Sequence, residues 1–409
     1  MHHTIATDVC YNGFILYWGR AISKTSFYIE EIGLGSNRLE SFVDLPWKLY
    51  RGDACWTPPL KGELLGSKLL GLRGLLTPRH PYHKHATVTH FLAWRGGQPV
   101  GRVSASINHR FNQHYHGKYG FFGHFESIND SSVSSALLDK AKDWVMRQGM
   151  QVLRGPGEYS TATHERQGIL IDGFEYPPTI DLTHNPPYYA ALLEQYGFQK
   201  AKDYHAYIMD VQAPSPESLR AVAQMSRGRR HIETRPVVVK DLRAEVGLIV
   251  KIYNETWAHN WGFLPITDEE ADMVADSLKL VVDPGLVRFG YVKGEIAAVL
   301  GAFPDPFYEL RPRWKWYGDA DLVRISRLLA SRRHIPVTRL IFFGIRPAYR
   351  MMGLDAVLFD EVKEYGMKRG YQKCEASLLL EDNELIIMAS QYMGAKKYKT
   401  WRIYDLPLK

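Results

Sequence analysis

The residues best suited to chemistry lie between an apolar strand that ends at Ile345 and an amphipathic helix that starts after Gly353. Pro347 sits in the tight turn between them, and Arg350 leads toward the glycine. A strand, a glycine turn and a helix start present several backbone N–H groups to one anion, and the helix dipole adds a favourable field. Gly353 has no side chain to keep phosphate oxygens away. The sequence therefore predicts a phosphate-binding turn here.

The elements that must position this turn occur twice along the 409 residues. In the second half, a helix over 242–257 precedes a hairpin, the strand at 339–345, a helix over 355–368, a strand at 373–380, a helix over 384–392 and a closing strand. Aligning the two halves at an offset of 197–198 residues places Gly197 on Gly394 and Tyr207 on Tyr404. We interpret this as an internal duplication. The predicted organisation is an extension over 1–36, a domain over 37–212, a linker over 213–235 and a second domain over 236–409.

The turn resembles a known motif. The pattern V/I-x-P-x-x-R-x-x-G-x-G/A after a strand is similar to the pyrophosphate loop of the GNAT acyltransferases, and it is matched by Ile345, Pro347, Arg350 and Gly353. Asn383, eleven residues before Gly394, resembles the family's second motif, in which Asn precedes the helix beside the pantetheine arm. The resemblance covers about 236–409. It implies an α/β (α+β) fold with two tandem GNAT-like domains, each a mixed, mostly antiparallel twisted sheet flanked by helices.

The resemblance also implies the donor and the reaction. The protein would be an N-acyltransferase that takes an acyl group from acyl-CoA, or from an acyl carrier, and joins it to a primary amine. Backbone groups near Phe343–Ile345 would pair with pantetheine, and one N–H would stabilise the oxyanion that develops on the thioester. The implied cofactor-binding residues are Phe343, Gly344, Ile345, Arg350, Met351, Met352, Gly353, Leu354 and Asn383. No metal is expected, because the 16 histidines match no zinc-binding spacing.

Two positions depart from the family pattern. Asp355 stands where most members have Gly or Ala, so either it points away as a helix cap or the turn binds a less anionic group. Ser390 stands where many members have the Tyr that protonates the leaving thiolate. Tyr392 is two residues further round the helix and does not replace it.

Candidates for the proton-transfer groups remain open. Glu381 and Ser390 flank the second motif. In the first half, the long polar loop that starts at Glu158 carries His164 and Glu165, which are further candidates. The first half has no counterpart of the phosphate turn, because the acidic, glycine-free stretch 129–132 stands in its place. We therefore expect the first copy not to bind the phosphates of CoA.

The acceptor is expected to lie against the segment that follows the first helix of the second copy. Trp257, Trp261 and Phe263 form an apolar slot there, and Asn260 supplies one polar anchor. Simple packing of this loop is the alternative. An apolar slot suits a lipid-like amine, and the GNAT-type bacterial ceramide synthases, which acylate a sphingoid amine, are the relatives that this suggests.

Charge and composition bear on partners and location. The net charge is +7, and no segment is long and apolar enough to span a bilayer. The stretch 311–339 has eight Lys/Arg against two Asp, interleaved with aromatic and aliphatic residues, which suits peripheral docking on an anionic membrane. The three scattered cysteines indicate a reducing compartment, so we expect a cytoplasmic protein, peripheral at the inner face of the membrane. A nucleic-acid partner is not expected, because no RNA-binding module accompanies the basic residues.

Two other functions stay open at this point. A tandem-GNAT transferase of the Fem type, which takes its donor from an aminoacyl-tRNA, would explain the basic charge. A non-catalytic binding protein that retains the fold would explain Asp355 and Ser390.

Overall fold

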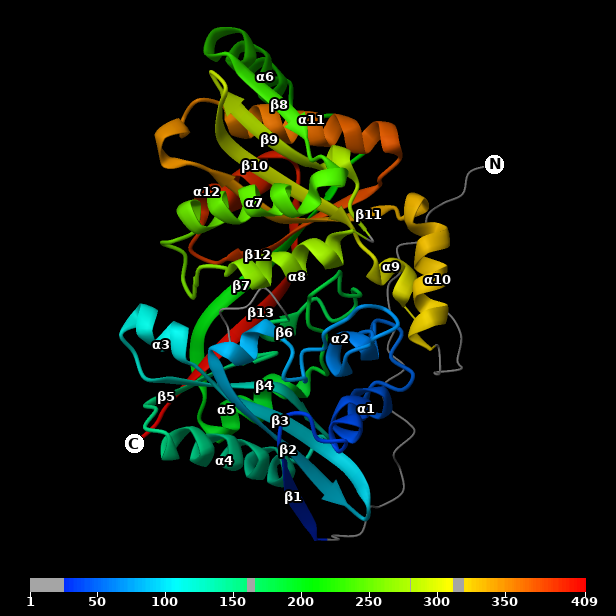
Figure 1. The fold of residues 1–409 in the computed structure, drawn as a ribbon, viewed down its shortest axis with the longest axis vertical. Coiled ribbons are helices and arrows are strands. Elements are labelled where there is room, and N and C mark those ends of the chain that lie inside the picture. The colour runs from blue at the N-terminus through cyan, green and yellow to red at the C-terminus, as the bar shows by residue number, and fades with distance from the viewer. Residues whose placement is uncertain (1–25, 160–165, 280, 312–319) are drawn as a thin grey trace. The chain divides into compact units, whose positions relative to one another are not determined.

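A computed structural model describes residues 26–159, 166–279, 281–311 and 320–409. The chain divides into two compact units (Figure 1). Unit 1 comprises residues 1–203, 310–323 and 399–409, and unit 2 comprises residues 204–309 and 324–398. Within the described residues, no helix is long and apolar enough to cross a membrane.

Unit 1 contains a mixed sheet with the strand order β1-β2-β3-β4-β5-β13, and β6 pairs with β13. The strands are β1 (Phe27–Ile32), β2 (Ala86–Arg95), β3 (Gln98–Asn108), β4 (Tyr119–Ser127), β5 (Val152–Gly157), β6 (Ile169–Asp172) and β13 (Lys396–Pro407). The helices are α1 (Leu39–Leu49), α2 (Lys61–Leu65), α3 (His109–Tyr115), α4 (Ser131–Arg147) and α5 (Tyr188–Tyr196). Its pairs are antiparallel except β4 with β5, which is parallel.

Unit 2 repeats this plan with the strand order β7-β12-β11-β10-β9-β8. Its strands are β7 (Gln199–Asp210), β8 (Ile232–Pro236), β9 (Val287–Val292), β10 (Glu295–Pro304), β11 (Val337–Ile345) and β12 (Lys373–Leu380). Its helices are α6 (Glu217–Arg230), α7 (Leu242–Thr256), α8 (Asp268–Leu278), α9 (Phe307–Leu310), α10 (Asp321–Ser331), α11 (Leu354–Arg369) and α12 (Glu384–Tyr392). Again only one pair, β11 with β12, is parallel. The predicted mixed sheet flanked by helices is confirmed.

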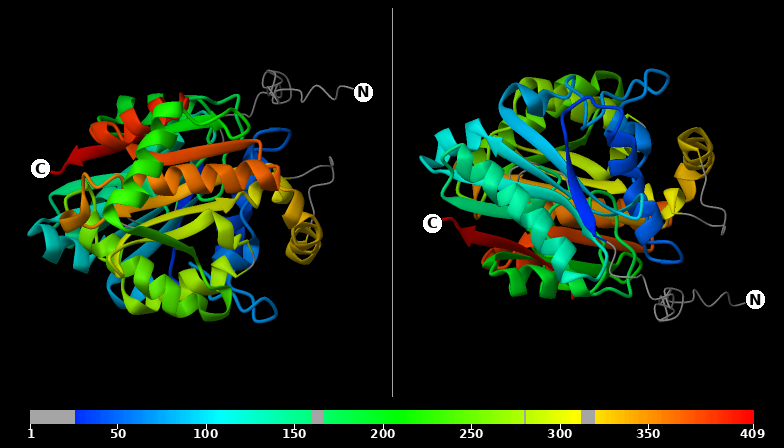
Figure 2. Two further views of the ribbon diagram at one scale, coloured as in Figure 1. Left: turned by 90° about the horizontal axis from the view of Figure 1, so that it is seen from above. Right: turned by 90° about the horizontal axis from the view of Figure 1, so that it is seen from below.

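Helices cover both faces of the unit 2 sheet, because its central strands are apolar on both sides. On one face, Leu300, Leu340 and Phe343 pack with buried residues of α6 and α11. On the other face, Val299 and Phe342 pack with α7 and α8. Figure 2 shows α11, in orange, running along the yellow strands β9 and β10. The phosphate turn therefore belongs to a helix that is anchored on the sheet.

The two closing strands carry the clearest trace of the duplication. β7 and β13 are each 12 residues long, lie 197 positions apart and have the same burial pattern at all positions but one. A glycine with positive φ ends the helix before each strand, Gly197 at +113° and Gly394 at +85°. Each closing strand pairs in the unit formed mainly by the other half: Tyr204–Asp210 along β12 in unit 2, and Tyr404–Pro407 along β5 in unit 1.

Candidate functional site

The turn between β11 and α11 leaves backbone donors without protein partners. After β11 ends at Ile345, one 3₁₀ turn (Pro347–Tyr349) leads to Met351, whose φ is +61°, and to Gly353, whose φ is +80°. Among the hydrogen bonds of the described residues, none is donated by the N–H groups of Met351, Met352 or Gly353. The first N–H groups of the 16-residue helix α11 also lack partners inside the helix. These groups could together bind an anion.

Gly353 is required for a reason that the sequence did not reveal. A Cβ atom built on it would lie 2.2 Å from Ser226 Oγ and 2.9 Å from Ser226 Cβ, because α6 packs directly against the turn. Its left-handed φ independently disfavours any other residue. The close packing of α6 on the turn and the positive φ of Gly353 therefore both require glycine at this position, whether or not a phosphate binds.

The basic run Arg227–Arg230 lies on the last turn of α6, beside the phosphate turn. Arg230 donates a hydrogen bond to Met351 O at 3.2 Å, and Arg227 pairs with Glu361 of α11 at 2.6 Å. Arg350 is exposed on the turn itself. The exposed carboxylate of Asp355 starts α11 nearby. Positive side chains thus accompany the free backbone donors.

The parallel pair β11–β12 separates beyond its fourth residue pair. The strands are in register from Val337–Lys373 to Leu340–Ala376, and no further pairing joins them, although β11 continues to Ile345 and β12 to Leu380. The predicted pantetheine-binding residues, Phe343–Ile345, lie in this separated part. The carbonyl oxygen of Phe343 in this part already accepts a hydrogen bond from Trp257 Nε1 at 3.1 Å. An extended ligand could add to the open edge as a strand does.

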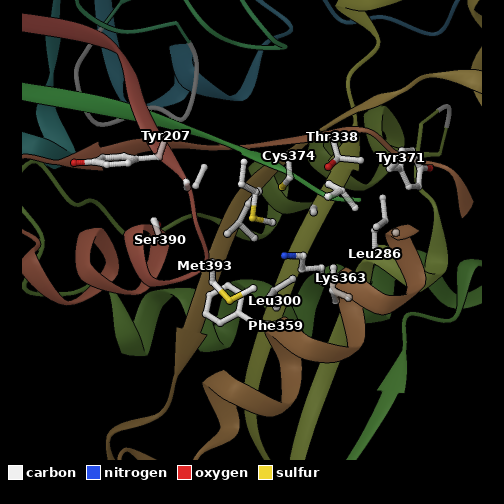
Figure 3. Close-up of a pocket in the computed structure, with 18 of the residues that line it drawn as sticks. Tyr207, Leu286, Leu300, Thr338, Phe359, Lys363, Tyr371, Cys374, Ser390 and Met393 are labelled. Atoms are coloured by element: carbon white, nitrogen blue, oxygen red, sulfur yellow. The ribbon is translucent and has the colours of Figure 1, made fainter. Parts of the chain in front are cut away.

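A cavity, part of it open to solvent, lies between this sheet and the helices α11 and α12 (Figure 3). Its lining is mainly apolar, and the polar members are Tyr207, Thr338, Lys363, Tyr371, Cys374 and Ser390. Burial raises the pKa of Cys374 to about 11, so its thiol is uncharged at neutral pH. The apolar lining of the cavity suits an alkyl chain.

Two of the predicted catalytic residues lie around the second motif. Ser390 lines the cavity, and its hydroxyl donates to Ile386 O at 2.8 Å, one turn earlier in α12. Glu381 follows the end of β12 and is half-buried. Asn383 precedes α12 without a side-chain bond to the helix. His164 and Glu165 lie outside the described residues.

The predicted acceptor residues cluster after α7 around other aromatic rings. Trp257 and Phe263 pack against Tyr253, with ring centroids 4.7 and 5.5 Å away. The ring centroids of Trp261 and Tyr204 are 6.3 Å apart. Asn260 holds the loop through its backbone, which accepts a hydrogen bond from Phe263 N–H at 3.2 Å. Phe263 is buried, whereas Trp257, Trp261 and Asn260 stay partly exposed.

A buried polar network at the strand separation was not anticipated as a site. Glu375 on β12 is fully buried, and it accepts hydrogen bonds from Ser377 Oγ at 2.5 Å and from the Tyr398 hydroxyl. Arg339 Nε donates to Ser377 Oγ at 3.0 Å. Burial and the adjacent Glu375 carboxylate raise the pKa of Tyr398 well above its usual value. Because Glu375 alternates with the cavity-lining Cys374 and Ala376, it points to the opposite face of the sheet. Sequence alternation indicated that orientation but could not bring Tyr398 to it.

The corresponding turn in unit 1 is occupied by the protein's own carboxylate. Asp130 accepts hydrogen bonds from the N–H and the hydroxyl of Ser132 at 2.9 and 2.6 Å, and it pairs with Arg95 at 2.7 Å. An anion would meet this carboxylate at the start of α4. The arrangement explains physically why the first copy is expected not to bind phosphate.

Unit 1 also buries a histidine network. His90 Nδ1 donates to Ile32 O at 3.1 Å, and His90 Nε2 accepts from Tyr159 Oη at 2.8 Å. His124 Nδ1 pairs with Ser104 Oγ at 3.0 Å. Burial lowers the pKa of His90 to about 4 and that of His124 well below its usual value, so both rings are neutral. No group of three His, Cys, Asp or Glu residues in the described chain is arranged to hold a metal ion.

Only part of the basic stretch at 311–339 is described, and it includes α10. Leu322, Val323 and Leu329 are 50%, 55% and 42% exposed. Arg324 is buried, and Arg327 donates to Glu309 O at 2.8 Å. Both arginines therefore serve internal contacts, and the exposed part of α10 is more apolar than the sequence pattern indicated.

Comparisons with known proteins agree with this architecture. The chain is 30% identical over 380 residues to the bacterial ceramide synthase of Caulobacter vibrioides, covering 90% of this chain and 95% of that protein. It is 28% identical over 383 residues to protein YghO of Escherichia coli K12, covering 91% and 93%. A scan against protein-family models finds no match.

Solved structures show the same fold at low sequence identity. A tandem GNAT protein from the clavulanic acid biosynthesis pathway, solved without AcCoA, has a TM-score of 0.52 at 11% identity and covers 94% of this chain and 99% of its own. The GCN5-related glucosamine N-acetyltransferase region of a fungal multi-domain β-N-acetylglucosaminidase has a TM-score of 0.54 at 15% identity, with 94% of this chain and 38% of that one covered. The protein is therefore an N-acyltransferase with the tandem GNAT fold and belongs to the family of the bacterial ceramide synthase.

Proposed function

We propose that this protein transfers a long acyl chain from acyl-CoA to the primary amine of a lipid-like, sphingoid-type acceptor. The observation that carries the proposal is that unit 2 combines three features. These are free backbone donors at 351–353, an open strand edge at Phe343–Ile345, and an apolar cavity between the sheet and the helices α11 and α12. These suit a diphosphate, a pantetheine arm and an alkyl chain in that order. The name of the ceramide synthase relative supports the choice of a lipid amine.

The chain's own groups can supply the steps of amide formation. The neutral amine attacks the thioester carbonyl, a C–N bond forms, the C–S bond breaks, and the amine proton must leave while the thiolate is protonated. An N–H of the open β11 edge would stabilise the oxyanion, an effect worth about 3 kcal/mol in comparable sites. Trp257, Asn260, Trp261 and Phe263 would hold the acceptor, as the sequence suggested.

For the proton transfer we propose the Glu375–Tyr398 pair in place of Ser390, and Glu381 as a further candidate. Tyr398 is protonated at neutral pH, as tyrosine ordinarily is, and burial beside Glu375 raises its pKa further. It lies at the strand separation, and its partner Glu375 is fixed by Ser377. Ser390 Oγ, in contrast, is already bonded to its own helix. This pair would take the role that a tyrosine of α12 has in many GNAT enzymes.

We also propose that the second copy alone binds the donor and that the protein docks at the inner face of the cytoplasmic membrane. The capped turn at Asp130 supports the first statement. The exposed apolar residues of α10, which lies within the basic stretch 311–339, support the second. A substrate with an alkyl tail would reach the site most readily from a lipid surface.

The experiment that tests the proposal measures binding of long-chain acyl-CoA and amide formation with a sphingoid amine. Met351→Glu is the variant of choice, because Met351 is 94% exposed and the new carboxylate would meet a diphosphate without disturbing the core. We expect this variant to lose acyl-CoA affinity through charge repulsion. Leu69→Glu, at a site 75% exposed in unit 1, is the matched control and should bind normally. Equal acyl-CoA affinity of both variants would refute the phosphate turn.

A further inference from the structure

The apolar cavity of unit 2 contains one charged side chain that the transfer reaction does not use. Lys363 lines the cavity from α11, among Leu300, Thr338 and Cys374 (Figure 3). Only 4% of its surface is exposed. Among the described residues, no hydrogen bond or ion pair of its amino group is found. The carboxylates of Asp210 and Asp360 attract its charge, but neither forms a hydrogen bond or ion pair with it.

A charged amino group in an apolar cavity is costly, because the cavity wall offers its N–H donors no acceptor. Burial accordingly lowers the pKa of Lys363. Two hydroxyls of the lining donate elsewhere, Thr338 to Lys373 O at 3.3 Å and Tyr371 to Asp283 Oδ2 at 2.8 Å, and neither accepts a hydrogen bond from Lys363. Among the described residues no protein group accepts from Lys363, so water or a ligand in the cavity would have to satisfy its donors.

Lys363 lies in the part of the cavity that is remote from the phosphate turn. α11 starts at Leu354, and nine residues at 1.5 Å each place Lys363 about 14 Å along the helix. β11 runs toward the turn, so Thr338, near its beginning, also lies at the remote end. Phe359, whose ring lies 4.9 Å from that of Phe343, lines the cavity nearer the separated strand ends. A chain entering between the strands would meet Phe359 first and Lys363 later.

We propose that Lys363 selects an acyl chain that carries an oxygen substituent, a hydroxyl or a carboxylate, on its distal part. The inference rests on the proposed function and names the class of its acyl donor. An unsubstituted chain would cover the amino group with methylene groups and leave its donors unsatisfied. An oxygen at that depth would accept a hydrogen bond, and a carboxylate would also neutralise the charge.

The test compares acyl-CoA donors of one chain length that are unsubstituted, distally hydroxylated or ω-carboxylated. We expect the wild-type protein to bind a substituted donor about tenfold more tightly than the unsubstituted one. Lys363→Met should abolish or reverse this preference, and Lys363→Arg should retain part of it. Lys368→Met is the matched control, because Lys368 lies on the same helix, is exposed and pairs only with Glu364. A stronger gain for the carboxylate than for the hydroxyl would identify a charge pair, and the converse would identify a hydroxylated chain.

A second arm uses ligands that do not need the phosphate turn: a free fatty acid, its methyl ester and the corresponding alcohol. Lys363-dependent discrimination among them without acyl-CoA binding would sustain this inference while rejecting the proposed function. Acyl transfer with no preference for substituted chains, unchanged in Lys363→Met, would overturn the inference and leave the proposed function intact.

Discussion

The hydroxyl of Tyr398 donates a hydrogen bond to Glu375 Oε2 on β12, one residue before β11 and β12 lose their pairing. The two residues come from different strands, β13 and β12, and Glu375 is fully buried. A neutral phenol bound to a fixed carboxylate at a strand opening is chemically equipped for proton transfer. This relationship leads to the first prediction.

Tyr398→Phe should lower kcat by about 10²-fold with little change in KM, because general acid–base groups contribute on that order and the ring would still fill its place. Ser390→Ala should stay near wild type, since the Ser390 hydroxyl is directed to Ile386 O. Steady-state kinetics with acyl-CoA and a sphingoid amine would measure both. The opposite ranking would assign the proton to Ser390 instead.

Gly353→Ala should destabilise unit 2 by about 1–3 kcal/mol, through strain at a left-handed φ and a clash with Ser226. Ser226→Gly should relieve the clash but not the strain, so the double variant should recover only part of the loss. Urea unfolding of the four proteins in the double-mutant cycle would give the coupling. Additive effects would mean that Ser226 does not restrain this turn.

Stability should fall as the pH drops below about 6.5, the ordinary pKa of histidine. Burial lowers the pKa of His90 in the folded protein to about 4. As the pH falls from 6.5 to 4, the unfolded chain therefore binds a proton at this residue and the native protein does not, so the free energy of unfolding decreases. For His90 alone the loss approaches about 3 kcal/mol once the pH is below 4. Urea midpoints from pH 7.5 to 4.5 should show the fall, and His90→Gln should flatten it. A curve with the same slope in this variant would exclude His90 as the source.

Replacing Leu322 and Val323 together by Glu should weaken sedimentation with anionic vesicles, because both side chains are at least half exposed on α10. Arg324→Ala should instead reduce stability, since that arginine is 3% exposed. Leu69→Glu again serves as a control for a charge placed on an exposed leucine. Undiminished sedimentation of the double variant would locate membrane contact elsewhere.

Local sequence determined the elements around the phosphate turn. The apolar strand to Ile345, the turn through Gly353 and the helix after it follow from hydrophobic periodicity and from glycine's φ, both of which depend on neighbours along the chain. The duplication was visible for the same reason, because β7 and β13 keep one burial pattern. The apolar segment with Trp257 and Trp261 was also readable in advance, although its packing on Tyr253 and Tyr204 was not.

Tertiary structure alone decided the features that join distant residues. No spacing predicts that Ser226 packs on Gly353, that Tyr398 reaches Glu375, or that Lys363 faces a cavity without a partner. The sequence also does not show that β7 pairs with β12 and that β13 pairs with β5. The two strands are so similar that either could form the backbone hydrogen bonds of either sheet edge. Periodicity specifies which side of an element is buried, but the identity of what it packs against depends on long-range contacts, and those contacts make the site.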